Sequence, residues 1–520
     1  AVSDVAEKIR SFLHFSVPDE GPLTDYESWM PDFMGGLAKG IESSRGLVEK
    51  AIRDVASDMV ISPKVGAAEF ASMEGGYGGM GNMVDFLAGI RSAVSEAMAG
   101  FAGQAGEYLR QLEDRGVTEH GHVVPSYFHP YVISAKQFQD IALHTETMAE
   151  ILFKVCHLFL LKEEIRDLFA FDPELLEWMQ GQPGYDMPVP ISRYDSYYHP
   201  RENRLIFNEF NADGTSGMNQ TNTMEEAFLE NPLGKKLAEE FGLYHCDLRQ
   251  QVLEVLLENY RKAGGSKETP HIAILDREDC ASPEEFEALK NTFLKRGYPT
   301  VIADPRELTY TEGTLFAGEF PIDIVYRRLV TVDLLGHREE AGTFLRAYTE
   351  GKVCTIGSLR TEVVHSKIIF CLLSDPAYHK FFTPAERDFL GAHIPWTRKL
   401  SLKDPALVRT VLSNKDSLLL KPHNAYASRG HIVGQDSTQK EWEEAVKRLS
   451  DTHYLVQEKI TAPEKELITG SGLPAELRKV NLGTYVFNGK LSGFYTRVSP
   501  HIVITTLRNG ALLPTLVSRD

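Results

Sequence analysis

The sequence predicts an α/β (α+β) fold of several domains, preceded by a mostly helical segment. Two observations carry this prediction. Short apolar stretches bounded by turns alternate with segments of helical periodicity through most of the chain. The composition also changes near residue 116, from rich in Ala, Gly, Met and Ser to the mixture typical of an α/β protein. The 520 residues are enough for two to four domains.

The amino-terminal segment, residues 1–116, has helical periodicity at Gly46–Val60 and Val84–Leu112. Between them lies the Gly-rich run Met73–Gly81. A phosphate-binding loop needs a strand before it and a Lys-Ser/Thr helix start after it, and this run has neither. We interpret it as a linker. The first residues, Ala1–Arg10, are amphipathic and lack the layout of a secretory signal.

Residues after 116 contain a long predicted helix, Ser134–Leu161, and further helices within Gly234–Ala263. Each predicted strand is short, apolar and bounded by turn residues. These strands are Arg204–Phe210, His271–Asp276, Thr300–Asp304, Ile322–Arg327, Ser417–Lys421, His453–Gln457 and Leu482–Phe487. Because strands alternate with helices, we expect a mainly parallel sheet.

Composition excludes several classes of protein. The formal net charge of −18 argues against nonspecific nucleic-acid binding through a basic surface. No stretch approaches the roughly 20 apolar residues of a membrane helix. The five cysteines are far apart, without a CxxC pair, so we expect neither a zinc site nor a disulfide framework. A reducing, cytoplasmic location is the expectation, with no membrane partner.

The most specific pattern is Arg193-x-Asp195 followed by Glu209-x-Asn211. Residues two apart on a strand share a face, so each pair points to one side of a sheet. Three oxygen ligands on one face can hold Mg²⁺ against a polyphosphate, and the Arg193 guanidinium can stabilise a developing anion there. The alternative interpretation is a surface salt-bridge ladder on an edge strand.

The turn Asp213-Gly-Thr-Ser216-Gly217 follows directly after Asn211. Its backbone N–H groups and hydroxyls would lie beside the metal ligands. The alternative interpretation is an ordinary turn after a strand.

Two later stretches fit a nucleotide site. In the first, Lys421 ends an apolar strand, where an ammonium group requires an anion, and a small-residue loop follows at Ala427–His431. In the second, Tyr454–Ile460, a strand ends in a carboxylate, Glu458, that could accept from an adenine amino group. Taken alone, the first stretch is weak evidence, and the second is better explained by a strand that leaves the sheet with a solvated Glu.

Together these segments resemble the ATP-grasp superfamily. In the usual order of that superfamily the lid lysines precede the metal carboxylates, whereas here Asp195 and Glu209 precede Lys421 and Glu458. This inverted order resembles the circularly permuted branch that includes glutathionylspermidine synthase. The segments Ile322–Arg328 and Val363–Leu373 are similar to motifs of that branch, although Ser366 replaces the usual Asn.

The resemblance spans about Val123–Val517. It implies a core at 117–265 with the metal site, a pre-grasp α/β domain at 266–385, a lid at 386–470 and a return to the core at 471–520. No cysteine precedes Cys156, so the amidase activity often fused to glutathionylspermidine synthases is not implied. Separately, residues 1 to about 60 resemble the carboxyl end of siphophage tail tape-measure proteins.

Residue by residue, the resemblance implies ATP and two Mg²⁺ ions as cofactors. Asp195 binds one Mg²⁺, Glu209 bridges both and Asn211 binds the second. Arg193 and Arg497 act in catalysis, with a surface strand-end arginine as the alternative for Arg497. The residues implied in nucleotide binding are Lys399 (or Lys403), Lys421, Ser428, Arg429, Gly430, Gln457, Glu458 and Ile460.

Asp213, Ser216 and Arg328 are the candidates for substrate contacts, with a structural ion pair as the equal alternative for Arg328. The implied reaction joins a small-molecule or peptide carboxylate to an amine through an acyl phosphate. The rival hypotheses are an ATP-grasp phosphotransferase and an inert, phage-derived structural protein. The sequence names neither substrate and does not determine the oligomeric state.

Overall fold

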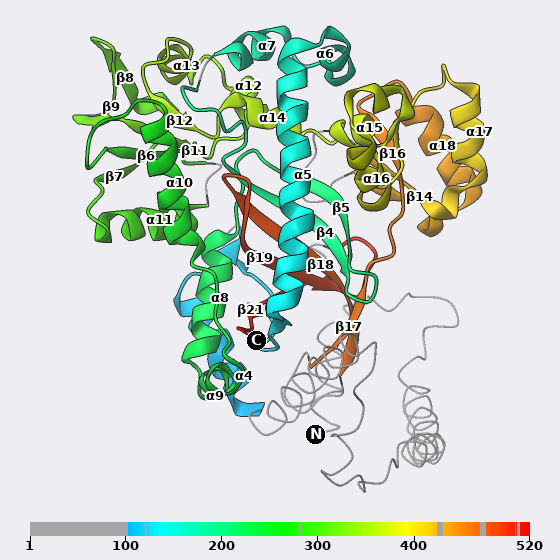
Figure 1. Ribbon diagram of the computed structural model, residues 1–520, viewed down its shortest axis with the longest axis horizontal. Coiled ribbons are helices and arrows are strands. Elements are labelled where there is room, and N and C mark those ends of the chain that lie inside the picture. Colours follow the sequence, from blue (N-terminus) through cyan, green and yellow to red (C-terminus); the bar gives the residue numbers. More distant parts are fainter. Residues whose placement is uncertain are drawn as a thin grey trace, which may run out of the picture. The chain divides into compact units, whose positions relative to one another are not determined.

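The chain divides into two compact units, Ala1–Gly81 and Asn82–Asp520. The computed structural model describes residues 102–119, 122–181, 183–279, 282–423, 430–468, 475–504, 506 and 510–519, all in the second unit (Figure 1). The tape-measure-like stretch and the helix expected at Gly46–Val60 lie outside the described residues. The end of the expected helix Val84–Leu112 is described, and it is helical as α4 (Ala102–Asp114).

A six-stranded sheet forms the centre of this unit, in the order β20-β19-β18-β4-β5, with β17 paired to β18. All of its strand pairs are antiparallel. The mainly parallel sheet expected from the sequence is therefore wrong for the largest sheet. Its strands form hairpins, whose turns contain Asn203 and Asn488-Gly489 with positive φ, and a hairpin is necessarily antiparallel. The strands are β4 (Ile191–His199), β5 (Arg204–Asn211), β17 (Glu464–Leu467), β18 (Glu476–Phe487), β19 (Lys490–Ser499) and β20 (Ala511–Leu513).

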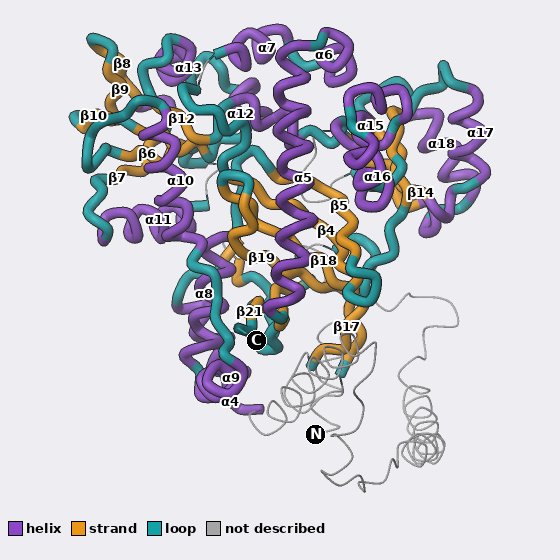
Figure 2. Tube along the Cα trace, viewed as in Figure 1, coloured by secondary structure: helices purple, strands orange, loops and turns teal. Residues whose placement is uncertain are grey.

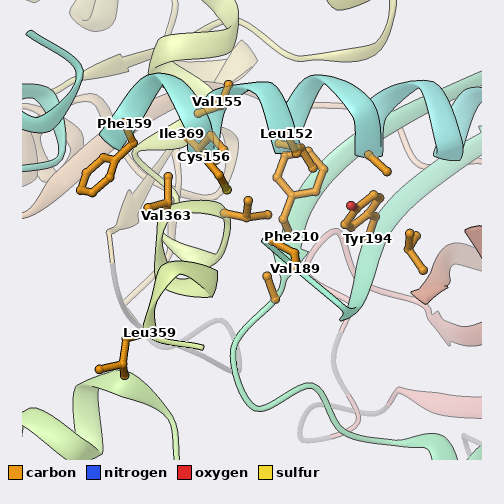
Figure 3. Packing of buried hydrophobic residues seen from close by; sticks show 14 of the residues in the cluster. Leu152, Val155, Cys156, Phe159, Val189, Tyr194, Phe210, Leu359, Val363 and Ile369 are labelled. Atoms are coloured by element: carbon orange, nitrogen blue, oxygen red, sulfur yellow. The ribbon is translucent and has the colours of Figure 1, made fainter. Parts of the chain in front are cut away.

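One face of this sheet is covered by α5 (Ala135–Leu161), as the sequence periodicity predicts (Figure 1). A capping box starts the helix: the Ser134 hydroxyl accepts from the Gln137 N–H at 3.2 Å, and the Gln137 carboxamide accepts from the Ser134 N–H. Figure 3 shows α5 side chains pointing at Tyr194 and Phe210 of the sheet, whose ring centroids lie 5.1 Å apart. The opposite face of β4 and β5 is thus left for polar residues.

A second, four-stranded sheet is parallel, in the order β12-β11-β6-β7, and it matches three of the predicted strands. Next to it lies an antiparallel three-stranded sheet in the order β10-β9-β8. The strands are β6 (Ile272–Leu275), β7 (Thr300–Ala303), β8 (Leu308–Thr311), β9 (Thr314–Ala317), β10 (Phe320–Ile322), β11 (Ile324–Arg327) and β12 (Cys354–Ile356).

A fourth sheet, of order β13-β16-β14-β15, is antiparallel and packs against two helices (Figure 2). Trp442 is fully buried at the centre of their shared core, and its Nε1–H donates to the Val411 carbonyl at 3.0 Å. The elements are β13 (Thr397–Lys399), β14 (Leu418–Pro422), β15 (Ile432–Val433), β16 (Tyr454–Glu458), α17 (Pro405–Ser413) and α18 (Gln439–Leu449).

The remaining elements connect these four sheets or cover them. None of the helices in the described part of the chain is both long enough and apolar enough to cross a bilayer. The helices are α6 (Glu163–Phe169), α7 (Pro173–Gln180), α8 (Met218–Glu230), α9 (Pro232–Phe241), α10 (Leu248–Lys262), α11 (Pro283–Lys295), α12 (Thr331–Gly336), α13 (Gly342–Thr349), α14 (Glu362–His365), α15 (Ile369–Ser374) and α16 (Pro384–His393). The short strands are β1 (Thr118–Glu119), β2 (His122–Val123), β3 (Tyr131–Ile133) and β21 (Thr515–Val517).

Candidate functional site

The four residues singled out on β4 and β5 lie opposite one another in pairs. Asp195 is the register partner of Glu209, and Arg193 is the register partner of Asn211. Directly opposite residues on antiparallel strands project from the same face of the sheet. The sheet therefore brings both carboxylates, the amide and the guanidinium together, as the spacing in the sequence predicts.

A β-bulge sets which side chains of β5 face this site. The register passes from Asp195↔Glu209 to Ser196↔Phe207, so Asn208 is an extra residue on β5. Without it, the alternation of the strand would put Phe207 and Glu209 on the same face. With it, Phe207 and Phe210 both enter the core, with ring centroids 5.8 Å apart, and Glu209 faces away from them.

Asp195 is the centre of the polar network and is 1% exposed. Its Oδ1 accepts from Nε of Arg193 at 2.9 Å, and its Oδ2 accepts from Nδ2 of Asn211 at 3.1 Å. Nη2 of Arg497, on β19, also donates to Oδ2. Gly483 is the register partner of Asp195 on β18, and a Cβ there would lie 2.9 Å from Oδ1 of Asp195. A glycine is therefore required for the network to form.

Arg193 and Arg497 approach Asp195 from different strands and share one aromatic neighbour. The guanidinium carbons lie 4.5 and 5.7 Å from the ring centroid of Tyr495. Arg497 is also held by Oδ1 of Asn481, its register partner on β18, at 2.9 Å. Burial alone would lower the pKa of Arg193, but the Asp195 carboxylate raises it above the ordinary value. Both guanidinium groups are fixed in place as cations beside the carboxylates.

Glu209 forms an ion pair with Lys367, a residue that was not among the predicted site residues. The Lys367 ammonium lies 2.7 Å from Oε1 of Glu209, and the lysine side chain is 6% exposed. Burial by itself would raise the pKa of Glu209, but Lys367, followed by Lys421, outweighs it and holds the pKa below the ordinary range. The motif Val363–Leu373 was the available signal, because Lys367 lies within it.

Lys421 ends β14, as predicted, and is buried. Its Nζ donates to the backbone carbonyl of Asn208 at 3.3 Å, so the bulge on β5 meets the end of β14. Burial lowers the pKa of Lys421 to about 8, against the attraction of Glu209. Lys421 therefore loses its proton at a lower pH than an ordinary lysine, and its ammonium group lies on the Glu209 side of the site.

A cleft lies between the six-stranded sheet and the β13-β16-β14-β15 sheet. Its empty volume is about 680 Å³, including the part open to solvent. It is lined by Tyr197, Asn208, Glu209, Leu419, Lys421, His431, Val433, Gln457, Glu458, Lys459, Ile460, Asn481, Arg497 and residues 502–504. Segments that are far apart in the sequence and were proposed separately therefore meet in one cleft.

The end of β16 forms another edge of the cleft. The Glu458 N–H donates to the Trp396 carbonyl at 2.8 Å, and Gln457 is buried, donating to Thr397 Oγ1 at 3.0 Å. Ile460 packs with an apolar group consisting of Tyr197, Ala462 and Ile504. An apolar wall beside a strand edge is suited to a flat, heteroaromatic ring.

Predicted nucleotide residues in the small-residue loop are only partly described. Ser428 and Arg429 lie outside the described residues. Gly430 has φ +74, and its carbonyl accepts from the Tyr454 hydroxyl at 3.3 Å. A Cβ on residue 430 would lie 2.8 Å from that hydroxyl oxygen. This end of the loop therefore requires glycine for both its conformation and its space.

The structure gives Lys399 a different environment from the one expected of a nucleotide lysine. Its Nζ donates to the Leu168 carbonyl at 3.0 Å, and the residue is absent from the lining of the cleft. Lys399 and Lys421 flank Leu455 on the neighbouring strands, but only Lys421 reaches the Glu209 side. The position beside Glu209 is taken by Lys367.

The predicted substrate residues Asp213 and Arg328 are in buried ion pairs. Asp213 pairs with Arg327, and it also accepts from the Thr331 N–H at 2.5 Å and from Thr361 Oγ1 at 3.0 Å. Both carboxylate oxygens of Asp213 already accept hydrogen bonds, and the residue is 3% exposed. Its carboxylate therefore holds the surrounding structure together and is not open to a substrate. The alternative given above for Arg328 is the one observed, since its Nη1 lies 2.9 Å from Oε1 of Glu285.

Ser216 enters the network through its backbone. Its carbonyl accepts from Nη1 of Arg193 at 2.9 Å and from the Tyr485 hydroxyl at 2.9 Å. The other oxygen of Glu285 accepts from the Gly217 N–H at 2.8 Å. The turn 213–217 is thus tied to β4 and β18 on one side and to the parallel-sheet region on the other.

The donor set fits Mg²⁺ better than a transition metal. Asp195, Glu209 and Asn211 offer carboxylate and amide oxygens, whereas no group of three or more His, Cys, Asp or Glu side chains within the described ranges could hold a metal by itself. Mg²⁺ commonly binds through one or two carboxylates and completes its octahedron with water and substrate phosphates. The three residues are suited to hold a metal that arrives with a phosphate ligand.

Comparison with known proteins gives a likeness of fold. No protein-family model and no curated protein matches the chain. The solved structure of a glutathione synthetase like-effector (GSS30) from Globodera pallida aligns with a TM-score of 0.53 at 11% identity, covering 80% of this chain and 96% of that chain. This likeness shows a shared fold.

Two further structures match with lower TM-scores. A putative gamma-glutamylcysteine synthetase from Methylobacillus flagellatus KT has 11% identity and a TM-score of 0.36, over 71% of this chain and 88% of that chain. The ATP-grasp ligase PsnB, complexed with a minimal precursor, has 17% identity and a TM-score of 0.29, over 47% and 88%. The α/β fold class predicted from the sequence is confirmed.

Proposed function

We propose that this protein is an ATP- and Mg²⁺-dependent ligase that forms an amide bond between a carboxylate and an amine, on a circularly permuted ATP-grasp fold. The observation that carries the proposal is the cleft itself. Glu209 and Arg497 line it from one sheet, and Lys421, Glu458 and Ile460 line it from another. An oxygen ligand for Mg²⁺, cations for phosphate and an apolar wall thus line one cavity.

ATP would lie along this cleft, with its base toward the end of β16 and its phosphates toward Glu209. Ile460 and its apolar neighbours would contact the adenine ring, and Glu458 would accept from the 6-amino group. Lys421 and Lys367 would contact the phosphates, since both lie on the Glu209 side. Lys367 would thus act beside Lys421, and a nucleotide contact of Lys399 or Lys403 stays a prediction from the sequence.

Asp195, Glu209 and Asn211 would hold Mg²⁺, with two ions as the expectation from the sequence. The metal would neutralise charge on the phosphates and orient them. Arg193 and Arg497 lie beside the same carboxylates, where they would stabilise the anion that develops as the acyl group is transferred. The loop that includes Ser428, Arg429 and Gly430 would cover the phosphates.

The reaction has two steps. An oxygen of the substrate carboxylate attacks the γ-phosphorus, the bond to the β-phosphate oxygen breaks, and ADP leaves an acyl phosphate behind. The amine then attacks the acyl carbon, inorganic phosphate leaves with the bonding electrons, and the amine loses a proton. Water has to be excluded from the cleft throughout, because it would hydrolyse the acyl phosphate.

The turn 213–217 would border the substrates. The Ser216 hydroxyl is the candidate for a direct contact, whereas Asp213 and Arg328 would act through the ion pairs that hold the turn. The substrates would be a small-molecule or peptide acid and an amine. The cytoplasmic location and the lack of nucleic-acid and membrane partners remain predictions from composition.

The test is release of ADP in the presence of pairs of acids and amines, followed by mass analysis of the product. A ligase gives a product with the mass of the acid plus the amine minus water, and one phosphate per ADP. A stable phosphorylated product would instead identify a phosphotransferase. Failure to bind any ATP analogue, with or without Mg²⁺, by a correctly folded protein would leave the inert structural protein as the remaining hypothesis.

A further inference from the structure

The proposed metal site holds more cationic than anionic side chains. Its anions are the carboxylates of Asp195 and Glu209. Arg193 and Arg497 are paired with the first, and Lys367 is paired with the second. Lys421, in the same cleft, acts on Glu209 as a further cation. Two carboxylates therefore face four cationic groups, so the site carries a net positive charge.

These contacts, with that of Asn211, also occupy three of the four carboxylate oxygens that a metal could use. Oδ1 of Asp195 accepts from Arg193, and Oδ2 accepts from both Asn211 and Arg497. Oε1 of Glu209 is 2.7 Å from the ammonium of Lys367. A divalent cation that arrived alone would have to displace cations from both carboxylates while it was repelled by them. Burial strengthens this repulsion, because Asp195 is 1% exposed and Lys367 is 6% exposed.

A polyphosphate reverses this balance. The triphosphate of a nucleotide is a polyanion, and it would attract the four cationic groups away from the carboxylates. The oxygens of Asp195 and Glu209 would then be free for Mg²⁺, and the phosphates would complete its coordination shell. The metal and the anion would each improve the site for the other, which is a positive coupling between two ligands.

We propose, on the basis of the function proposed above, that the site binds the triphosphate without metal and does not bind a free divalent cation. The ion pair of Lys367 with Glu209 is one of the contacts that enforce this order. The metal site is complete only after a polyphosphate anion has paired with the lysine and arginine side chains, which releases the carboxylate oxygens. A polyphosphate anion therefore binds first, and a divalent cation binds second or enters in complex with that anion.

Equilibrium dialysis of the full-length protein at pH 7 tests the proposal, with Mn²⁺ as the metal probe and a non-hydrolysable ATP analogue free to cross the membrane. The Mn²⁺ retained by the protein is measured with and without the analogue. Binding of the analogue itself is measured in EDTA by calorimetry. We expect binding of the analogue in EDTA, and Mn²⁺ affinity at least about tenfold higher with the analogue than without it.

Mn²⁺ that binds the wild-type protein equally well without the analogue, and is lost in Glu209→Gln, would overturn the proposal while leaving the nucleotide site intact. Absence of analogue binding both with and without metal would instead remove the proposed function, and this inference with it. These measurements use the wild-type chain and Glu209→Gln, and they do not depend on whether any Lys367 variant folds.

Three variants test the role of Lys367. We expect Lys367→Met to increase the affinity for Mn²⁺ alone by about fivefold or more, because one competing cation is removed. Lys367→Arg retains the charge and should still exclude the free metal. Lys154→Met is the matched control, since Lys154 also lies 2.7 Å from a glutamate, Glu386, outside the site. An equal change in Lys154→Met and Lys367→Met would contradict a specific role for Lys367.

Discussion

Asp195 and Gly483 face each other across β4 and β18, and the missing side chain of the glycine leaves the space in which the Asp195 carboxylate and Arg193 lie. A Cβ on residue 483 would be 2.9 Å from Oδ1 of Asp195 and 3.0 Å from Cδ of Arg193. Both neighbours are buried and are held by several hydrogen bonds. Neither can move without disrupting the network.

Gly483→Ala should therefore destabilise the protein by about 1–3 kcal/mol through overpacking. It should also weaken nucleotide binding by at least about tenfold, by displacing Asp195. Thermal unfolding and titration with an ATP analogue and Mg²⁺ measure the two effects. Gly391→Ala in α16 is the control, because a Cβ there meets no atom within 4 Å. Normal nucleotide binding by Gly483→Ala would show that the tight approach of these residues does not matter for the site.

Glu209→Gln should reduce turnover by about a hundredfold or more, because it removes an anion that the proposed mechanism uses to hold Mg²⁺. The exchange is nearly isosteric, but it leaves the buried Lys367 ammonium without its ion-pair partner, so the thermal unfolding temperature should fall, and activity is compared well below it. ADP release by the purified variant is the measurement. A rate close to that of the wild type would exclude Glu209 as a metal ligand.

Nucleotide affinity should fall as the pH rises through about 8, the pKa to which burial lowers Lys421. The ammonium form attracts phosphate, and it is lost above that pH. Lys421→Arg stays charged at all pH values in this range, so its affinity should remain flat between pH 7 and 9. Titrations of an ATP analogue at several pH values compare the two proteins. A parallel decline in both would assign the pH dependence to another group.

The lowered pKa of Lys421 also predicts a pH dependence of stability, which is opposite in sign to that of nucleotide affinity. Its pKa in the folded state is about 8, below the value of about 10.4 for an unfolded chain. Between these values the unfolded state binds more protons, so the free energy of unfolding should rise with pH in this window. Lys421→Met should lose this rise. Chemical denaturation of both proteins at pH 7.5 and 9.5 measures the difference.

Arg327→Met should destabilise the protein by about 3–5 kcal/mol, because it leaves the buried Asp213 carboxylate without its ion-pair partner. Replacing Asp213 by Leu in the same chain should restore part of the loss, since no unpaired charge then remains. Denaturant unfolding of the single and double variants gives the two values. An additive loss in the double variant would show that the ion pair is not the origin of the effect.

The sequence by itself was sufficient where the information is local. Helical periodicity with a capping box at Ser134 specifies α5, and the two-residue spacings 193/195 and 209/211 put each pair on one face of a strand. The apolar run that ends in Lys421 and the strand that ends in Glu458 were also recognisable, because each is defined by its neighbours in the chain.

Only the tertiary structure decided which of these segments meet. The bulge at Asn208 depends on the register between β4 and β5, and the pairing of Lys367 with Glu209 joins residues that are far apart in the sequence. The antiparallel arrangement of the largest sheet and the burial of Asp213 against Arg327 have the same origin. These features depend on long-range packing and on the desolvation of charges. Neither can be deduced from the order of residues along one strand or helix.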